Sequence, residues 1–188
     1  VQRLLAQRLR ERRRRHEAIA RRVEPERRVG VAAAAEDGAA VLEALHGVGE
    51  SQRAGMAFLI ANMPEPDLRT LSASYLLENT SLAYRTLAAT PWAKSMPNDI
   101  FLNDILPYAS VTERRDNWRK RLHEICQPLI KDCKTPGEAA QALNRKIFSL
   151  LNVRYSTKRR APDQGPLETM ETGVATCTGL SVLLVDAC

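Results

Sequence analysis

The sequence predicts a predominantly α-helical chain over its 188 residues. Three observations support this fold class. Apolar residues recur at three- and four-residue steps over long stretches, Pro and Gly separate those stretches, and a strong helix-start signal occurs at Thr135. With 44% hydrophobic and 27% charged residues, the composition is that of a globular chain that can bury a sizeable core.

Three helical segments are expected before residue 90. The first starts near Gly38, and the second runs from Ser51 to Asn62 and is ended by Pro64 and Pro66, because proline supplies no amide hydrogen. Asp67 is placed to cap the third segment, which is either one long helix to Ala89 or a short turn and a helix. The apolar residues of all three are expected in the core.

Residues 91–110 are irregular but rich in aromatic and aliphatic side chains, so this segment should pack down on the fold. Asn98 or Asp99 could cap a short helix there, and Ser110 or Thr112 could begin the next long one. In that long helix Trp118 faces inward, and Pro128 is expected to interrupt the helical pattern. Its five basic residues should form a mostly solvated surface: Arg114, Arg115, Arg119, Lys120 and Arg121.

Thr135-Pro-Gly-Glu138 combines a hydroxyl cap, proline at the first helical position and glutamate three residues after the cap. It predicts a helix that runs to about Leu151. A short extended piece at residues 152–156 and an exposed loop at 157–165 should come next. A further helix is predicted to begin at Cys177.

The charge is concentrated at one end of the chain. The net charge is +6, but residues 1–28 hold eleven arginines against four glutamates, a net +7, so the remainder carries −1. A solvated basic extension is the main interpretation, with nucleic-acid contact and docking on an anionic membrane as alternatives. The absence of aromatic residues from this segment gives no support to base stacking. The sequence therefore disfavours a nucleic-acid-binding role for the folded body.

Neither a metal site nor a disulfide framework is predicted. The four cysteines, at positions 126, 133, 177 and 188, include no Cys-x-x-Cys pair, and the three histidines are scattered. We interpret Cys126 and Cys133 as free thiols, with a disulfide between them as the alternative in an oxidising compartment. No cofactor is expected. No apolar run reaches the roughly twenty residues that span a bilayer. The cytoplasm is the default compartment, and an export signal before Val1 stays open.

Cys177 is the candidate nucleophile. It stands between small residues, Ala175, Thr176 and Gly179, at the predicted start of an apolar helix. A thiol attacks as its thiolate, and a helix N-terminus favours that ionised form of a thiol. Cysteine is also a common small core residue, so burial in the helix is the competing interpretation. Cys188, on the expected buried face of the same helix, is interpreted as a packing residue.

The segment Pro166-Leu-Glu-Thr-Met-Glu-Thr-Gly-Val-Ala-Thr-Cys177-Thr-Gly-Leu-Ser-Val-Leu-Leu-Val-Asp-Ala-Cys188 resembles the cysteine helix of bacterial transglutaminase-like proteins. Residues 91–110 are similar to the helical lead-in of a bacterial branch of that superfamily. The resemblance implies an α+β, papain-like fold for the full-length protein, in which a histidine and an aspartate follow the cysteine on adjacent strands. It assigns only Cys177 to a catalytic position in this chain, and Thr176 and Thr178 depart from the Gly-x-Cys pattern of many relatives.

On this basis we expect three regions: a basic extension and linker at 1–37, a helical N-terminal region at 38–133, and the start of a transglutaminase-like catalytic domain at 134–188. The implied activity is acyl transfer or peptide hydrolysis on protein or peptide amides through a Cys177 thioester. The oligomeric state and the exact reaction stay open.

The sequence does not identify a general base for Cys177. His16, His46 and His123 are not assigned to catalysis, and His123 is expected on the surface of a lead-in helix. The Cys177 backbone N–H could hold the oxyanion, with Tyr155, Ser156 or Gln164 upstream as candidates for an additional donor. Without an imidazole base the chain as given should be inactive. A noncatalytic protein-interaction module of the same fold is the alternative function.

Overall fold

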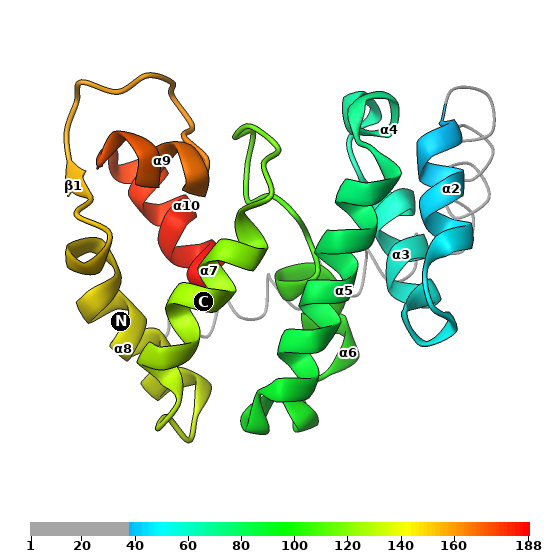
Figure 1. The fold of residues 1–188 in the computed structure, drawn as a ribbon, viewed down its shortest axis with the longest axis horizontal. Helices are drawn as coiled ribbons and strands as arrows, with labels where there is room; N and C mark the ends of the chain where they lie inside the picture. The colour runs from blue at the N-terminus through cyan, green and yellow to red at the C-terminus, as the bar shows by residue number, and fades with distance from the viewer. Residues whose placement is uncertain (1–37) are drawn as a thin grey trace, which may run out of the picture. The chain divides into compact units, whose positions relative to one another are not determined.

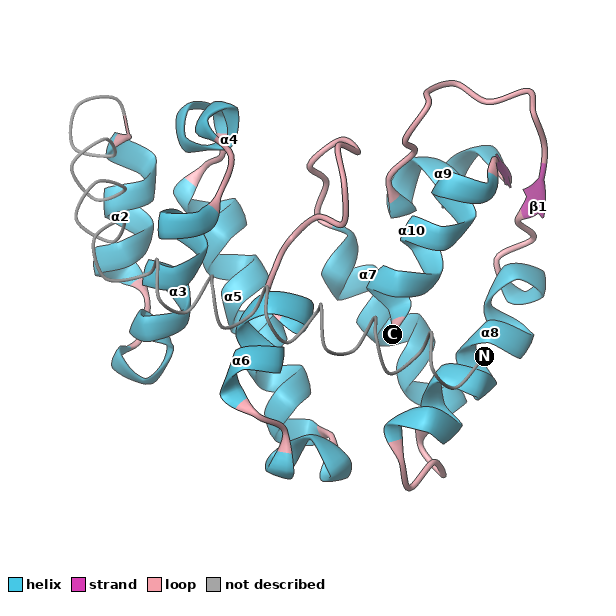
Figure 2. Cartoon of the chain, turned by 180° about the vertical axis from the view of Figure 1, so that it is seen from behind, coloured by secondary structure: helices cyan, strands magenta, loops and turns pink. Residues whose placement is uncertain are grey.

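A computed structural model describes residues 38–188. The basic extension and linker predicted at residues 1–37 therefore lie outside the described residues. The chain divides into two compact units, with the boundary between Leu76 and Leu77. The described part is mostly helical, as predicted (Figures 1 and 2).

The described part of the first unit contains three helices and the start of a fourth. They are α2 (Ala39–Gly47), α3 (Glu50–Asn62), α4 (Glu65–Thr70) and the first turn of α5 (Ala73–Ala89). Helices α2 and α3 pack together through apolar residues spaced three or four apart, among them Val41, Ala44, Met56 and Leu59. The single long helix is wrong, because α4 and α5 are separate helices, and the predicted short turn before the long helix is the short helix α4.

The predicted cap of that short helix is wrong. Helix α4 begins at Glu65 with Pro64 at the N-cap position, and Asp67 lies inside the first turn, where it is buried. Pro66 is tolerated there because the first amides of a helix have no partner within the helix. Pro64 and Pro66 therefore end one helix and start the next.

The second unit is built on α7 (Trp118–Ile130), α8 (Pro136–Leu150) and α10 (Cys177–Ala187), which pack against one another. Its buried apolar cluster includes Trp118, Leu122, Ile147 and Leu183. The rest of α5 leads into the short helices η1 (Pro91–Ser95), α6 (Asn98–Ile100) and η2 (Phe101–Ile105), where Phe101 packs edge-on against Tyr84. The segment before α7 is thus packed down, as predicted.

Two predictions about α7 are wrong. The helix begins at Trp118 after Asn117, not at Ser110 or Thr112, because residues 110–117 form a loop held by its own hydrogen bonds. Pro128 does not interrupt α7, which continues to Ile130. Sequence periodicity alone could not show that loop, because its hydrogen bonds join a side chain to nearby backbone amides.

The start of α8 agrees closely with the sequence signal. Thr135 Oγ1 accepts the Glu138 amide N–H at 3.2 Å, and the Glu138 carboxylate accepts the amide N–H of Lys134 at 2.7 Å. Such reciprocal capping satisfies amides that have no partner in the first helical turn. The predicted helix to about Leu151 is confirmed, since α8 ends at Leu150.

A small sheet occurs where only one extended piece was predicted. Strands β1 (Arg154–Tyr155) and β2 (Val174–Ala175) pair in parallel, with Arg154 opposite Val174 and Tyr155 opposite Ala175. The predicted extended piece at residues 152–156 is confirmed by β1. Helix α9 (Pro166–Thr172) lies between the strands in sequence and packs on α10.

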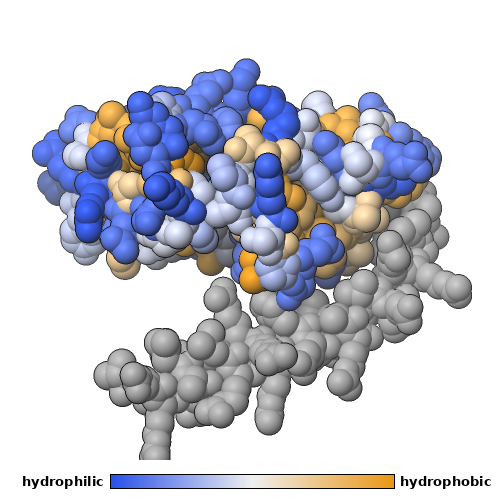
Figure 3. All heavy atoms as spheres, turned by 90° about the horizontal axis from the view of Figure 1, so that it is seen from below, coloured by the Kyte–Doolittle hydropathy of each residue, from blue (hydrophilic) through white to orange (hydrophobic). Residues whose placement is uncertain are grey.

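Hydrophilic side chains cover most of the face of the molecule seen in Figure 3, and hydrophobic ones show in small patches between them. Large exposed hydrophobic residues are spread over different elements, with exposures from 39% to 62%: Ile100, Val111, Leu150, Tyr155 and Val185. Among residues 38–188, no helix combines the length and the apolar character that crossing a bilayer requires.

Candidate functional site

Cys177 is the first residue of α10, as predicted, and its side chain is exposed. Helix α9 ends at Thr172, and its C-cap residue Gly173 has a φ of +65°, a left-handed conformation that favours glycine. Val174 and Ala175 then form β2, and Thr176 is the N-cap of α10. A turn, two strand residues and a cap therefore place the sulfur at the start of the helix.

The opposite side of the first turn of α10 is tightly packed. A Cβ atom at Gly179 would lie 2.9 Å from the Ala175 Cβ and 3.3 Å from the Gln164 Cβ. Only glycine allows so close an approach without displacing its neighbours. Because residues two apart on a helix face nearly opposite sides, buried Gly179 and exposed Cys177 fix the orientation of this turn.

Gln164 is fully buried beneath this turn. Its side-chain Nε2 donates to the Val174 carbonyl at 3.2 Å and to Thr172 Oγ1 at 3.4 Å. Both donor hydrogens are thereby directed at the α9–β2 turn, so Gln164 supports the turn from below. Of the other upstream candidates for an oxyanion donor, Tyr155 is 62% exposed and Ser156 donates its amide N–H to the Ala175 carbonyl.

All four cysteines are free, and Cys126 and Cys133 are less exposed than Cys177. Burial raises the pKa of the Cys126 thiol to about 11, with a smaller contribution from nearby Cys188. Partial burial also raises the pKa of Cys188, although that residue as a whole is exposed, against the expectation of a packing role. Cys133 is partly buried in the connection between α7 and α8.

His123 is not the surface residue that was expected. It lies half-buried on α7, where its Nδ1 is 3.0 Å from Thr86 Oγ1, and burial followed by the charge of Arg85 lowers its pKa. His46 is exposed on α2. Within residues 38–188, no histidine hydrogen-bonds to Cys177, and no group of three or more His, Cys, Asp or Glu side chains could hold a metal ion.

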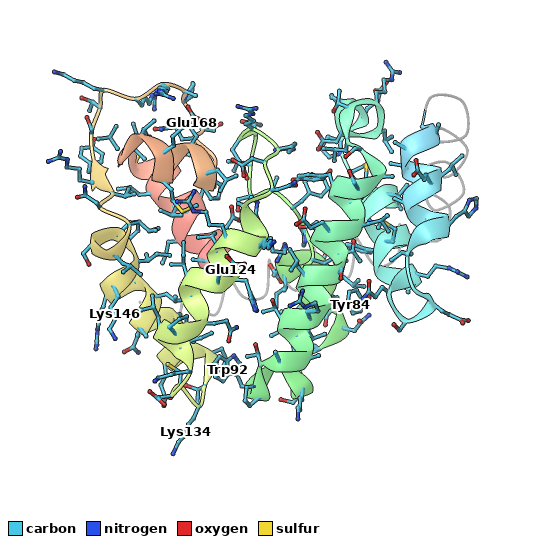
Figure 4. The ribbon with its side chains drawn as sticks, viewed as in Figure 1. Tyr84, Trp92, Glu124, Lys134, Lys146 and Glu168 are labelled. Atoms are coloured by element: carbon cyan, nitrogen blue, oxygen red, sulfur yellow. The ribbon has the colours of Figure 1, made fainter. Side chains whose placement is uncertain are left out.

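An apolar cavity of about 570 Å³ lies in the second unit beside α10. Trp92 and Trp118 contribute to its wall, and Figure 4 shows Trp92 between the end of α5 and α7. From α10, Ser181 and Val185 line the cavity. These two residues follow Cys177 at steps of four, so all three share one exposed side of the helix.

Asp186, near the end of α10, is a carboxyl group that sequence reasoning missed. Burial raises its pKa to about 7, and the charges of Glu113 and Asp116 raise it further, against the lowering effects of Ser110 and Arg119. Ser110 Oγ donates to Asp186 Oδ1 at 2.9 Å. No local sequence pattern identifies Asp186, because the groups that act on it come from the loop before α7 and from α7 itself.

The raised pKa of Asp186 predicts a pH-dependent stability. The ionised form is penalised in the folded state, so Asp186 should destabilise the fold above pH 7 and this penalty should shrink as the pH falls to 5. Relative to wild type, Asp186→Asn should raise the free energy of unfolding by roughly 2 kcal/mol more at pH 8 than at pH 5. Urea unfolding at both pH values measures this, with exposed Asp132→Asn as the control. Equal effects of Asp186→Asn at the two pH values would contradict it.

No protein-family model matches this chain, and no curated protein or solved structure is significantly similar to it. The functional argument therefore depends on the residues and their geometry.

Proposed function

We propose that Cys177 is the nucleophile of a cysteine acyltransferase or peptidase of the transglutaminase-like type, acting on protein or peptide amides. The observation that carries this proposal is the position of Cys177: exposed, at the first residue of α10, on a turn whose other side is locked against Gln164. A thiol at a helix N-terminus, with free access from solvent, has the environment that reactive cysteines use. The papain-like fold of the full-length protein belongs to the same proposal.

The reaction has two steps. The Cys177 thiolate attacks the carbonyl carbon of a carboxamide, the C–S bond forms, the C–N bond breaks, and ammonia or an amine leaves with a proton. An amine or water then attacks the thioester carbonyl and releases the thiol. The apolar cavity that begins beside Ser181 offers a place for an apolar part of the substrate.

General-base catalysis is expected to need a group beyond those described. Because no histidine in residues 38–188 hydrogen-bonds to Cys177, this stretch lacks an effect typically worth about a hundred- to ten-thousand-fold in rate. The resemblance to transglutaminase-like proteins implies a histidine and an aspartate in the full-length enzyme. Thiol reactivity is therefore the property to test in this chain.

Iodoacetamide should alkylate Cys177 at least about tenfold faster than Cys126 at pH 7.5, because Cys126 is buried and its pKa is raised to about 11. Cys177 should also react faster than Cys133. Quenched aliquots analysed by peptide mass spectrometry give the four rates in one experiment. In 6 M urea the four rates should converge, which serves as the control for intrinsic reactivity.

A Cys177 rate no higher than that of Cys133 would contradict the proposal. It would favour the alternative, a noncatalytic protein-interaction module, for which Cys177→Ala should leave biological activity intact. The observation that favours this alternative is the absence of a histidine hydrogen bond to Cys177 within the described part of the chain.

A further inference from the structure

Residues 107–117, which connect η2 to α7, contact both ends of the α9–β2–α10 segment that carries Cys177. We call these residues the clasp. Just before the segment, Thr112 Oγ1 donates to Asp163 Oδ2, and in the first turn of α9 the Asp116 carboxylate accepts a hydrogen bond from the Leu167 amide N–H. At its end, Ser110 Oγ donates to Asp186 Oδ1 at 2.9 Å. One loop therefore holds the segment on either side of the nucleophile.

The clasp has a defined conformation of its own. The Glu113 carboxylate, only 3% exposed as a residue, accepts the amide N–H groups of Ser110 at 2.6 Å and Val111 at 2.8 Å. The Arg115 guanidinium donates to the Glu113 carbonyl at 2.7 Å. At the junction with α7, Trp118 Nε1 donates to the Tyr108 carbonyl at 3.0 Å. These bonds hold the clasp in one shape, so it can act as a fixed support.

Asp116 makes the central contact of the clasp with α9. Leu167 is in the first turn of α9, where amides have no partner within the helix, and the N-cap residue Gly165 offers no side chain. Asp116 supplies the missing acceptor from another part of the chain. A Cβ at Gly165 would lie 2.9 Å from Asp116 Oδ2, so the glycine makes room for the carboxylate.

The position of α9 is transmitted to Cys177 through short connections. Helix α9 has seven residues, too few to be stable without tertiary contacts. Its last residue is Thr172, whose Oγ1 lies 2.9 Å from the Glu168 carbonyl oxygen and 3.0 Å from that of Val174. Strand β2 then leads directly to the N-cap of α10. Thr169 of α9 also lies close to Gly179, since a Cβ atom added at Gly179 would be 3.5 Å from Thr169 Oγ1.

We propose that Asp116 is a positioning residue for Cys177: through Leu167 it anchors α9, and with Ser110 and Thr112 it holds the nucleophile turn between two fixed ends. This inference rests on the proposed function, in which Cys177 is the reacting group. Asp116 acts through α9 and does not touch the sulfur or the substrate. Glu168, labelled in Figure 4, lies on the same first turn of α9.

The test compares Asp116→Ala, Asp116→Asn and wild type by the ratio of alkylation rates of Cys177 and Cys133. Alanine removes the acceptor for the Leu167 amide and should loosen the turn that holds Cys177 at the start of α10, where thiols are more reactive. We therefore expect the ratio to fall several-fold, up to roughly tenfold. Asparagine keeps an acceptor oxygen and should retain the wild-type ratio. Asp132→Ala, which removes an exposed carboxylate between α7 and α8, is the matched control.

Two further readouts separate positioning from a general loss of structure. Unfolding would expose Cys126 and accelerate its alkylation, whereas loss of positioning should slow Cys177 and leave Cys126 unchanged. Amide hydrogen exchange should increase in residues 166–176 and stay constant in α8. If Asp116→Ala does not fold, Thr112→Val removes the neighbouring contact to Asp163 with a smaller perturbation and should lower the ratio in the same direction.

The proposal is overturned if Asp116→Ala leaves both the ratio and the exchange of residues 166–176 at wild-type values, or if Asp116→Asn is as damaging as Asp116→Ala. The wild-type ratio by itself tests the reactivity of Cys177. Failure of the proposed function and failure of the clasp are therefore separate outcomes.

Discussion

Replacing Ile147 with alanine is expected to lower the free energy of unfolding by about 2–5 kcal/mol. Ile147 is completely buried, and its cluster includes Trp118 and Leu183 from α7 and α10. The shorter side chain would leave a cavity at the meeting point of three helices, because tightly packed neighbours relax only partly. Urea unfolding followed by circular dichroism measures the loss.

Leu150→Ala is the matched control for this prediction. Leu150 lies on the same helix but is 58% exposed, so its truncation should cost no more than about 0.5 kcal/mol. Similar losses for the two variants would show that α8 does not bury the side that carries Ile147.

Arg119→Ala is expected to cost about 3 kcal/mol, the second large effect. The Arg119 guanidinium donates to Asn79 Oδ1 at 2.8 Å and to the backbone carbonyls of Ile105 and Pro107 at 2.8 and 2.7 Å. It also lies over the Trp118 ring, 4.5 Å from the centroid. Alanine would leave partly buried acceptors without their donor, which costs more than the bonds themselves contribute.

Arg121→Ala provides the comparison, since Arg121 is an exposed residue of the same type on the same helix. Its loss should change the stability by less than about 0.5 kcal/mol. Thermal or urea unfolding of the two variants distinguishes them directly. If both are neutral, the Arg119 bonds do not stabilise the connection between α5, η2 and α7.

Arg119 shows the limit of the charge-pattern prediction. The basic residues around the start of α7 were predicted as a mostly solvated surface, and Arg114, Lys120 and Arg121 are exposed. Arg119 instead donates to Asn79 and to backbone carbonyls of residues 105–107, and Arg115 donates to the Glu113 carbonyl within the clasp and lies over the Tyr108 ring. A charge pattern shows that arginines cluster. It does not show that carbonyl groups from a distant turn converge on one of them, because that depends on tertiary structure.

Sequence signals that involve only neighbouring residues predicted the structure more accurately. The cap at Thr135 and Glu138 predicted the start of α8 because its hydrogen bonds join residues within four positions of each other. Cys177 at the start of α10 was likewise predictable from the small residues around it. Asp116 and Asp186 were not, since their environments arise from contacts between the clasp, α9 and α10.

The parallel pairing of β1 with β2 has a consequence for the order of folding. Val174 follows its partner Arg154 by twenty positions, so the pair can form only after the chain between them has closed into a loop. Closing such a loop costs chain entropy before any strand contact compensates for it, whereas helices such as α8 form from neighbouring residues. We therefore expect the surroundings of Cys177 to reach their native arrangement late in folding, once α7 and α8 have paired.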